Sequence, residues 1–136
     1  MKNIVIANQK KEILYVSPTT SGKKHDYNIT KNELIPQNLP PIPTYVDTGF
    51  AGIKDVVKNP DLIFMPKKKP RNGSLTADEK ETNSIISSIR VKVEHVIGGI
   101  KRFNCLSYIY RNKKGQDDQF IAIASGLWNY HLRMMA

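Results

Sequence analysis

The feature that most constrains the fold is an amphipathic segment at residues 76–103, with the sequence TADEKETNSIISSIRVKVEHVIGGIKRF. Its first residues, Thr76 and Glu79, are three apart and can form a capping box, in which each side chain accepts a hydrogen bond from the backbone N–H of the other residue. Apolar residues then recur every three or four positions, at Ile85, Ile89, Val93, Val96, Ile100 and Phe103. This spacing predicts a long helix with one stripe facing a core.

Four polar residues lie off that stripe: Ser87, Arg90, Glu94 and Lys101. Arg90 and Glu94 are four residues apart, and Glu94 and Lys101 are seven apart, so these three side chains share one face of the helix. A carboxylate between two cations can be a metal ligand beside a phosphate-binding surface. It can equally belong to an ordinary helical ion pair, which contributes only ~0.2–0.5 kcal/mol. Spacing alone favours the ion pair.

Length and charge limit the class of protein. The chain has 136 residues, which predicts a single domain over residues 1–136. No apolar run approaches the ~18 residues that a membrane-spanning helix needs, so no membrane is expected as a partner. The lone cysteine, Cys105, excludes an internal disulfide framework. The formal charge of +9 favours a polyanionic partner such as nucleic acid, although ribosomal and other basic proteins share this property.

The other elements follow from β-branched runs and helical periodicity. Strands are predicted at residues 3–7, 13–16, 44–46 and 62–65, and helical segments at residues 25–34, 53–58 and 120–134. A short apolar run is expected within residues 104–114. The order is then β-β-α-β-α-β-α-α, which is an α/β arrangement. Trp128 is expected as a core anchor of the last helix, in preference to a base-stacking platform.

Two further segments have chemical interest. Asp47 follows the predicted strand at residues 44–46, and a carboxylate at the carboxyl end of a strand stands where α/β sheets usually bind ligands. The alternative is that Asp47 begins a turn that Gly49 permits, and the local pattern leaves the two readings open. Residues 67–74 (KKKPRNGS) form a basic segment that is either a solvated loop or a phosphate-binding one.

Three segments taken together resemble one family: VDTGF around Asp47, NSIISSIRVKVEHVIGGIKRF around Glu94, and SPTTSGKKHDYNI before them. The family is the DDE superfamily endonucleases, which includes bacterial insertion-sequence transposases and the related Harbinger group. Its pattern Asp-x-Gly-Tyr/Phe-x-Gly matches Asp47, Gly49, Phe50 and Gly52. The spacing of Arg90, Glu94 and Lys101 also matches, whereas Ser87 stands where the family signature has Tyr.

The resemblance implies a ribonuclease-H-like mixed sheet with flanking helices and a DNA-cutting activity. It implies that Asp47 and Glu94 are two of three metal-binding catalytic carboxylates, and that Arg90 and Lys101, together with Lys67, Lys68 and Lys69, contact DNA phosphates or neutralise charge. The expected cofactor is Mg²⁺ or Mn²⁺, in a two-metal site formed only in the complete enzyme. The expected location is the bacterial cytoplasm, at the nucleoid.

The resemblance also implies a truncated catalytic domain. The first catalytic Asp of the family lies on a strand upstream of the segment that matches residues 3–7, and here only Met1 and Lys2 precede that segment. We therefore expect an incomplete sheet and a fragment inactive on its own. Its expected partners are DNA and the missing amino-terminal half, and the sequence leaves homo-oligomerisation open. The alternative is a non-catalytic basic DNA-binding remnant.

Overall fold

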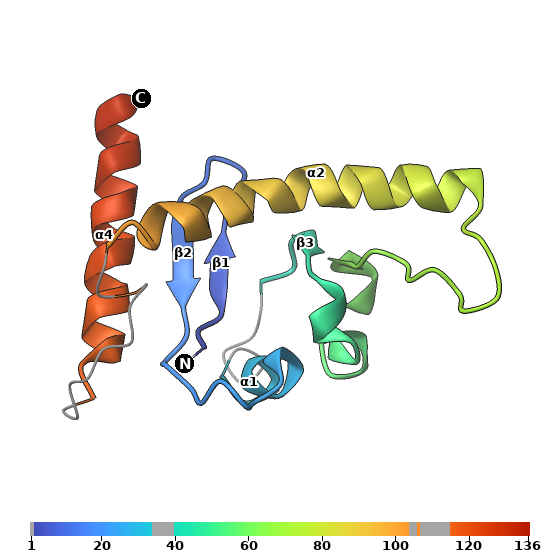
Figure 1. Cartoon of the computed structure of the whole chain (residues 1–136), viewed down its shortest axis with the longest axis horizontal. Helices are drawn as coiled ribbons and strands as arrows, with labels where there is room; N and C mark the ends of the chain where they lie inside the picture. The colour runs from blue at the N-terminus through green and yellow to red at the C-terminus, as the bar shows by residue number, and fades with distance from the viewer. Residues whose placement is uncertain (1, 34–39, 104–105, 107–114) are drawn as a thin grey trace. The chain divides into compact units, whose positions relative to one another are not determined.

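The structure is a computed structural model that describes residues 2–33, 40–103, 106 and 115–136. The first half of the described chain contains β1 (Val5–Ala7), β2 (Ile13–Val16), α1 (Asp26–Glu33) and β3 (Thr44–Tyr45). Three short 3₁₀ turns and β4 (Ile63–Phe64) follow, and then the two long helices α2 (Ala77–Ile100) and α4 (Asp117–Met135) (Figure 1). The described fold is therefore mixed α/β, as the sequence predicts, with small sheets and several helices.

The contacts of the chain divide it into two compact units. We call Met1–Gly22 with Lys92–Ala136 the hairpin unit, and Lys23–Val91 the central unit. The helix α2 contributes its first part to the central unit and its last turns to the hairpin unit. The single domain predicted from sequence length stays a prediction.

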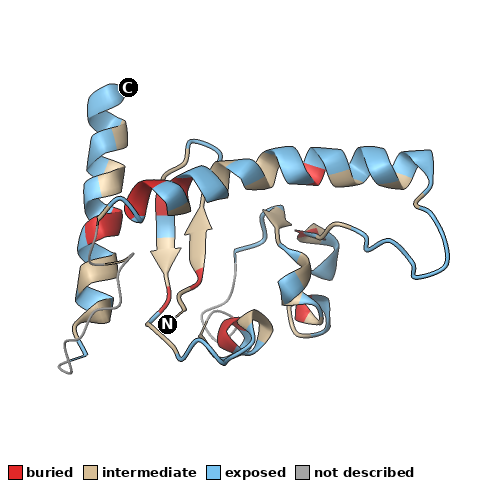
Figure 2. Cartoon of the chain, in the orientation of Figure 1, coloured by how far each residue is buried: buried red, intermediate tan, exposed pale blue. Residues whose placement is uncertain are grey.

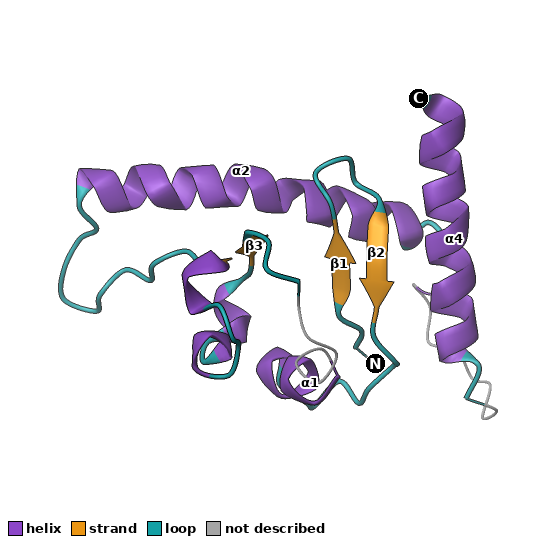
Figure 3. Ribbon diagram, turned by 180° about the vertical axis from the view of Figure 1, so that it is seen from behind, coloured by secondary structure: helices purple, strands orange, loops and turns teal. Residues whose placement is uncertain are grey.

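In the hairpin unit, β1 and β2 pair antiparallel, with Val5 opposite Val16 and Ile6 opposite Tyr15 (Figure 3). The side chain of Asn8 builds the turn between them, because its Oδ1 accepts hydrogen bonds from the backbone N–H groups of Lys10 and Glu12. Asparagine is favoured in turns because its side chain can bond to nearby backbone in this way. The hairpin predicted at residues 3–16 is confirmed, with a first strand shorter than predicted.

The core of the hairpin unit joins the hairpin to both long helices. Its buried residues are Ile13 of β2, Val96 and Ile100 of α2, and Ala124 of α4. The burial colouring shows these buried positions at the C-terminal end of α2 and in the lower half of α4 (Figure 2). Trp128 packs against the same cluster. The long helix therefore does bury an apolar stripe, at the end where the two helices and the hairpin meet.

Two neighbouring side chains of α4 fasten this helix to the hairpin. The indole N–H of Trp128 donates to the backbone oxygen of Lys11 at 2.8 Å. The side-chain amide of Asn129 accepts from the backbone N–H of Ile13 at 2.8 Å and donates to its carbonyl oxygen at 2.9 Å. Trp128 is thus partly buried and hydrogen-bonded, which agrees with its expected role as a core anchor.

A glycine allows the indole ring to approach α2 closely. A Cβ atom added at Gly99 would lie only 2.0 Å from Cζ3 of Trp128, whereas one added at the adjacent Gly98 would meet nothing within 4 Å. Only Gly99 of this pair is therefore required by packing.

In the central unit, β3 and β4 pair in parallel, with Thr44 opposite Ile63 and Tyr45 opposite Phe64. Between them the chain makes 3₁₀ turns at Thr48–Phe50, Ile53–Asp55 and Pro60–Leu62. The helical segment predicted at residues 53–58 is therefore wrong in type. Gly52, at φ 94°, takes the left-handed conformation just before it, and Asn59–Pro60 interrupts the chain soon after it, so too few residues remain for a regular helix.

The start of α2 confirms the capping box, because Thr76 Oγ1 accepts from the N–H of Glu79 at 3.2 Å and Glu79 Oε2 accepts from the N–H of Thr76 at 3.0 Å. The apolar stripe differs at one position: Ile85 is 55% exposed, whereas Ile86 is 3% exposed. The buried face thus begins one residue later than the sequence suggests. Three- and four-residue steps from Ile89 lead to both positions, so periodicity did not separate them.

The remaining boundaries agree closely with the predictions. The first short helix begins at Asp26, whose carboxylate lies in its first turn, and α4 begins three residues earlier than predicted, at Asp117. The apolar run predicted within residues 104–114 lies almost entirely outside the described residues. Among the helices of the described part, none is both long and apolar enough to cross a membrane.

Candidate functional site

Asp47 lies directly beyond the short parallel sheet of the central unit. The backbone N–H of Val46 donates to the carbonyl oxygen of Phe64 at 2.9 Å, which extends the pairing of β3 with β4 up to the residue before Asp47. Asp47 then caps the turn at Thr48–Phe50, and its Oδ1 accepts the backbone N–H of Thr48 at 2.6 Å. Asp47 therefore begins a turn directly at the carboxyl end of a strand, and its role as a ligand-binding residue stays a prediction.

The two glycines after Asp47 have separate structural reasons. A Cβ at Gly49 would lie 3.3 Å from Oδ2 of Asp26, so glycine lets the turn approach the first residue of α1 closely. Gly52 has a φ of 94°, which favours glycine for conformational reasons. The Asp-x-Gly-Phe-x-Gly pattern is thus the sequence of a tight, specific turn that presents the carboxylate of Asp47.

An ion pair joins this turn to α2. A terminal nitrogen (NH2) of the Arg90 guanidinium lies 3.1 Å from Oδ2 of Asp47. The Arg90 side chain is 25% exposed and the Asp47 side chain 54% exposed. Each carboxylate oxygen of Asp47 therefore has a partner, Thr48 for Oδ1 and Arg90 for Oδ2, and the orientation of the group is fixed from two sides.

Glu94 follows Arg90 by one turn of α2 and is exposed. Lys101 comes just after the end of α2 and is exposed as well. Both residues belong to the hairpin unit, whereas Asp47 and Arg90 belong to the central unit. That Asp47 and Glu94 share one metal-ion pocket stays a prediction.

The basic segment runs from Lys67 toward the start of α2 and is attached to that helix. The backbone N–H of Lys67 donates to Oδ1 of Asn83 at 2.8 Å, and Nδ2 of Asn83 donates to the carbonyl oxygen of Lys67 at 2.9 Å. The Lys67 ammonium group also pairs with the carboxylate of Glu79. This ammonium group, together with the Thr76 N–H, lowers the pKa of Glu79 from its ordinary value. Sequence reasoning missed Asn83, because an amide sixteen residues from its partner leaves no local signal.

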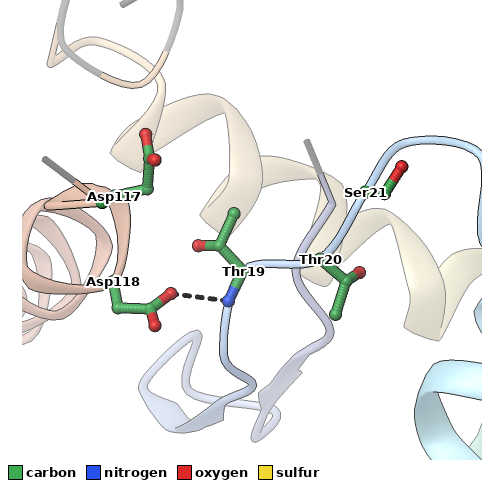
Figure 4. Close-up of a pocket in the computed structure, with 6 residues that line it drawn as sticks. Thr19, Thr20, Ser21, Asp117 and Asp118 are labelled. Carbon is green, nitrogen blue, oxygen red and sulfur yellow. Dashed lines mark hydrogen bonds between the residues drawn. The ribbon is translucent and has the colours of Figure 1, made fainter. Parts of the chain in front are cut away.

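A pocket in the hairpin unit involves other residues. It has a volume of ≈ 240 Å³ and lies between the segment after β2 and the first turn of α4; its lining residues are Thr19, Thr20, Ser21, Gly115, Asp117 and Asp118. Asp118 Oδ1 accepts the backbone N–H of Thr19 at 2.6 Å across it (Figure 4). The side chain of Thr19 and, to a smaller extent, its backbone N–H lower the pKa of Asp118 from its ordinary value, because both stabilise the charged carboxylate. None of the predicted site residues lines this pocket, although Thr19, Thr20 and Ser21 belong to the SPTTSGKKHDYNI segment.

The described residues around Asp47 do not provide enough ligands for a metal ion. Across residues 2–33, 40–103, 106 and 115–136, no three His, Cys, Asp or Glu side chains gather so that they could hold a metal ion. Oδ1 of Asp47 already accepts a hydrogen bond from Thr48, and Oδ2 is already ion-paired with Arg90. The described residues alone therefore do not fit a resident metal ion.

Comparison with known proteins identifies the family. The DDE superfamily endonuclease family matches residues 1–129, which is nearly the whole chain. The chain belongs to this family. A relative is the probable transposase for insertion sequence element IS702 of Microchaete diplosiphon, which is 29% identical over 136 residues. The match covers 100% of this chain and 48% of the relative, so the chain spans about half the length of that protein. No solved structure matches the chain.

Membership of the DDE superfamily confirms the resemblance carried by the three segments around residues 17–29, 47 and 94. The family is one of endonucleases, and it implies dependence on a divalent metal ion and action on DNA. Because the chain covers 48% of the transposase it resembles, its own activity is a proposal.

Proposed function

We propose that this chain supplies part of the catalytic domain of a DNA transposase, in which Asp47 and Glu94 are two of three metal-binding catalytic carboxylates. The finer fold that goes with this proposal is a ribonuclease-H-like sheet, extended by a strand beyond those described. The complete enzyme would bring DNA and a divalent ion together and would cut and rejoin phosphodiester bonds. Carboxylate oxygens suit Mg²⁺ or Mn²⁺, and such ions activate the attacking oxygen and stabilise the leaving one.

One observation carries the assignment of Asp47. Its carboxylate stands at the end of a parallel strand and is held by Arg90, which precedes Glu94 by one turn of α2. The bond to Thr48 is sufficient to cap the turn. Capping alone therefore does not account for the ion pair with the distant Arg90. The ion pair therefore supports a role for Asp47 beyond capping.

Arg90, Lys101 and the basic segment have proposed roles in the complete enzyme. Arg90 orients Asp47 and neutralises its charge, while Lys101 and the basic segment contact DNA phosphates. The formal charge of +9 supports this, because non-specific affinity for DNA comes from cations that displace the counterions of the phosphates.

The shared ion site can be tested without catalytic turnover. Fe²⁺ occupies Mg²⁺ sites, and with ascorbate and peroxide it produces hydroxyl radicals that cut the polypeptide nearby. With the amino-terminal half of the transposase supplied in trans, we expect cleavage of this chain around residues 47 and 94, suppressed by excess Mg²⁺. Either Asp47→Asn or Glu94→Gln should weaken cleavage at both segments, since both carboxylates would hold the same ion.

Matched controls are available for both variants. Asp61→Asn changes another exposed carboxylate of the central unit, and Glu81→Gln changes another exposed carboxylate of α2. Both should leave the cleavage pattern unchanged. Cleavage that is scattered, or that responds to Asp47→Asn at one segment only, would contradict a common site.

Activity itself requires a second assay. Because the described residues gather no third carboxylate at Asp47, we expect little Mg²⁺- or Mn²⁺-dependent cleavage of supercoiled DNA by this chain alone. Supplying the amino-terminal half of the transposase in trans should restore cleavage, and Asp47→Ala should abolish it. Robust cleavage by the chain alone, lost in Asp47→Ala, would show that two carboxylates are enough. Salt-sensitive binding without cleavage in either mixture would instead identify a DNA-binding remnant.

A further inference from the structure

The basic loop at residues 67–74 is anchored at its first residue. Asn83 holds both backbone groups of Lys67, and Glu79 holds its ammonium group, so one residue receives three contacts from two successive turns of α2. The helix that supplies these contacts is itself capped by Thr76 and Glu79. The start of the loop is therefore tied to a rigid element at a defined point.

The cations that follow are in a different position. Lys68, Lys69 and Arg71 are exposed. Pro70 restricts the backbone of Lys69 to extended conformations, and the N–H of Gly73 donates to the carbonyl oxygen of Pro70 at 3.4 Å, which closes a turn. Three exposed cations within four residues, held close to an anchored residue, present a concentrated positive charge. A pre-ordered charged loop binds a polyanion with a smaller loss of conformational entropy than an unanchored one.

We propose that the loop is a pre-ordered DNA-phosphate-binding site in which Lys68, Lys69 and Arg71 contact phosphates, whereas Lys67 is an internal strut. The proposal rests on the proposed function, since it takes DNA as the partner. It also divides the basic segment in a way that its sequence does not show: the first of four cations is engaged by Glu79 and Asn83, and the next three are available. Asn83 is then a positioning residue for DNA binding, although it carries no charge.

The salt dependence of DNA binding tests this division of roles. The affinity of the full chain for a short fluorescent duplex is measured by anisotropy over a series of salt concentrations. Each phosphate contact contributes about 0.9 to the slope of log K against log salt for B-DNA. We expect Lys68→Gln, Lys69→Gln and Arg71→Gln each to flatten the slope by roughly that amount. Lys67→Gln should leave it nearly unchanged, although the same charge is removed.

A charge-neutral variant tests the anchor. Asn83→Ala keeps a good helix former in α2 but removes both bonds to the Lys67 backbone. We expect DNA affinity to fall about three- to tenfold with nearly the same salt slope, because the three phosphate contacts still form but the loop must be ordered first. Asn32→Ala, an exposed asparagine of α1, is the matched control and should not change the affinity. Thermal melts of each variant verify that the fold is retained.

The outcomes separate this inference from the proposed function. If the wild-type chain shows no salt-sensitive binding to the duplex, DNA is not its partner and both proposals fail. If the wild-type chain binds with a steep slope that the three loop variants leave unchanged, only the loop assignment fails. A slope that Lys67→Gln flattens as much as Lys68→Gln would overturn the strut role of Lys67.

Discussion

Arg90 and Asp47 form an ion pair of 3.1 Å that joins α2 to the turn after β3. The two residues are 43 positions apart, and each was expected to act on its own, Asp47 on a metal ion and Arg90 on a phosphate. In the structure, the guanidinium group instead holds one oxygen of the carboxylate. The guanidinium group thus orients the carboxylate before any other cation reaches it.

This pair predicts a measurable coupling between the two side chains. Arg90→Gln, Asp47→Asn and the double variant are compared by urea unfolding at low salt. We expect the effects of the single variants on the free energy of unfolding to be non-additive by about 0.5–1 kcal/mol, since both groups are partly exposed. The coupling should fall in 1 M salt, where exposed charges are screened. A control cycle combines Arg90→Gln with Asp61→Asn, and the effects of these two variants on the free energy of unfolding should be additive. Strict additivity in the first cycle would mean that the ion pair is absent in solution.

The close approach of Trp128 to α2 predicts opposite effects at two adjacent glycines. Gly99→Ala would place a methyl group 2.0 Å from the indole ring, so the ring must move and its bond to Lys11 must weaken. We expect a loss of about 1–3 kcal/mol in the free energy of unfolding, as is typical of overpacked sites. Gly98→Ala meets no atom within 4 Å and should stabilise the helix by roughly 0.5–1 kcal/mol. Thermal unfolding followed by tryptophan fluorescence measures both, and equal effects at the two positions would rule out this packing.

The bond from Thr19 to Asp118 predicts a dependence of stability on pH. The pKa of Asp118 is lower in the folded chain than its ordinary value, mainly because of Thr19, so the folded state binds fewer protons than the unfolded state in acid. The stabilisation is complete above the ordinary aspartate pKa of about 3.9 and is lost as the pH falls through the lower folded pKa. It should be about 0.5 kcal/mol, because the carboxylate is exposed.

A pair of variants isolates this bond. Asp118→Asn should lower the stability at pH 7 and flatten its decline between pH 5 and pH 2, as measured by urea unfolding. Asp117→Asn removes the same charge from the same turn of α4 and leaves the Thr19 bond in place, so it controls for the interaction with the helix dipole. Identical pH profiles for the two variants would show that Thr19 does not stabilise the charged form of Asp118.

Much of the local structure could be read from the sequence because local patterns determine it. The β-branched run at residues 13–16 gave β2 with its observed bounds, and the Thr76–Glu79 capping box gave the start of α2 to within one residue. The first residue of the buried stripe on α2 was predicted to be Ile85, but it is Ile86. Helical steps of four and three residues back from Ile89 lead to both positions. The segment after Gly52 has the composition of a helix. The positive φ of Gly52 is not helical, and the chain forms short turns there instead.

The contacts between these elements could not be predicted from such local patterns. Asn83 and Asn129 each hold both backbone groups of one distant residue, 16 and 116 positions away. Nothing in the neighbouring sequence distinguishes these asparagines from solvent-facing ones. The choice of Asp47 as the partner of Arg90 is of the same kind, since the spacing on α2 pointed only to Glu94. Resemblance to a family supplied the candidate residues, and the structure supplied their partners.

The amide of Asn129 has a consequence for how the hairpin can associate with other chains. By bonding to both the N–H and the C=O of Ile13, it imitates the next strand of a sheet and closes the outer edge of β2 at that position. An exposed edge is a template for unwanted pairing, and a single side chain blocks it here. Any strand that enlarges this sheet, from the same protein or from another, is thereby directed to the side of β1.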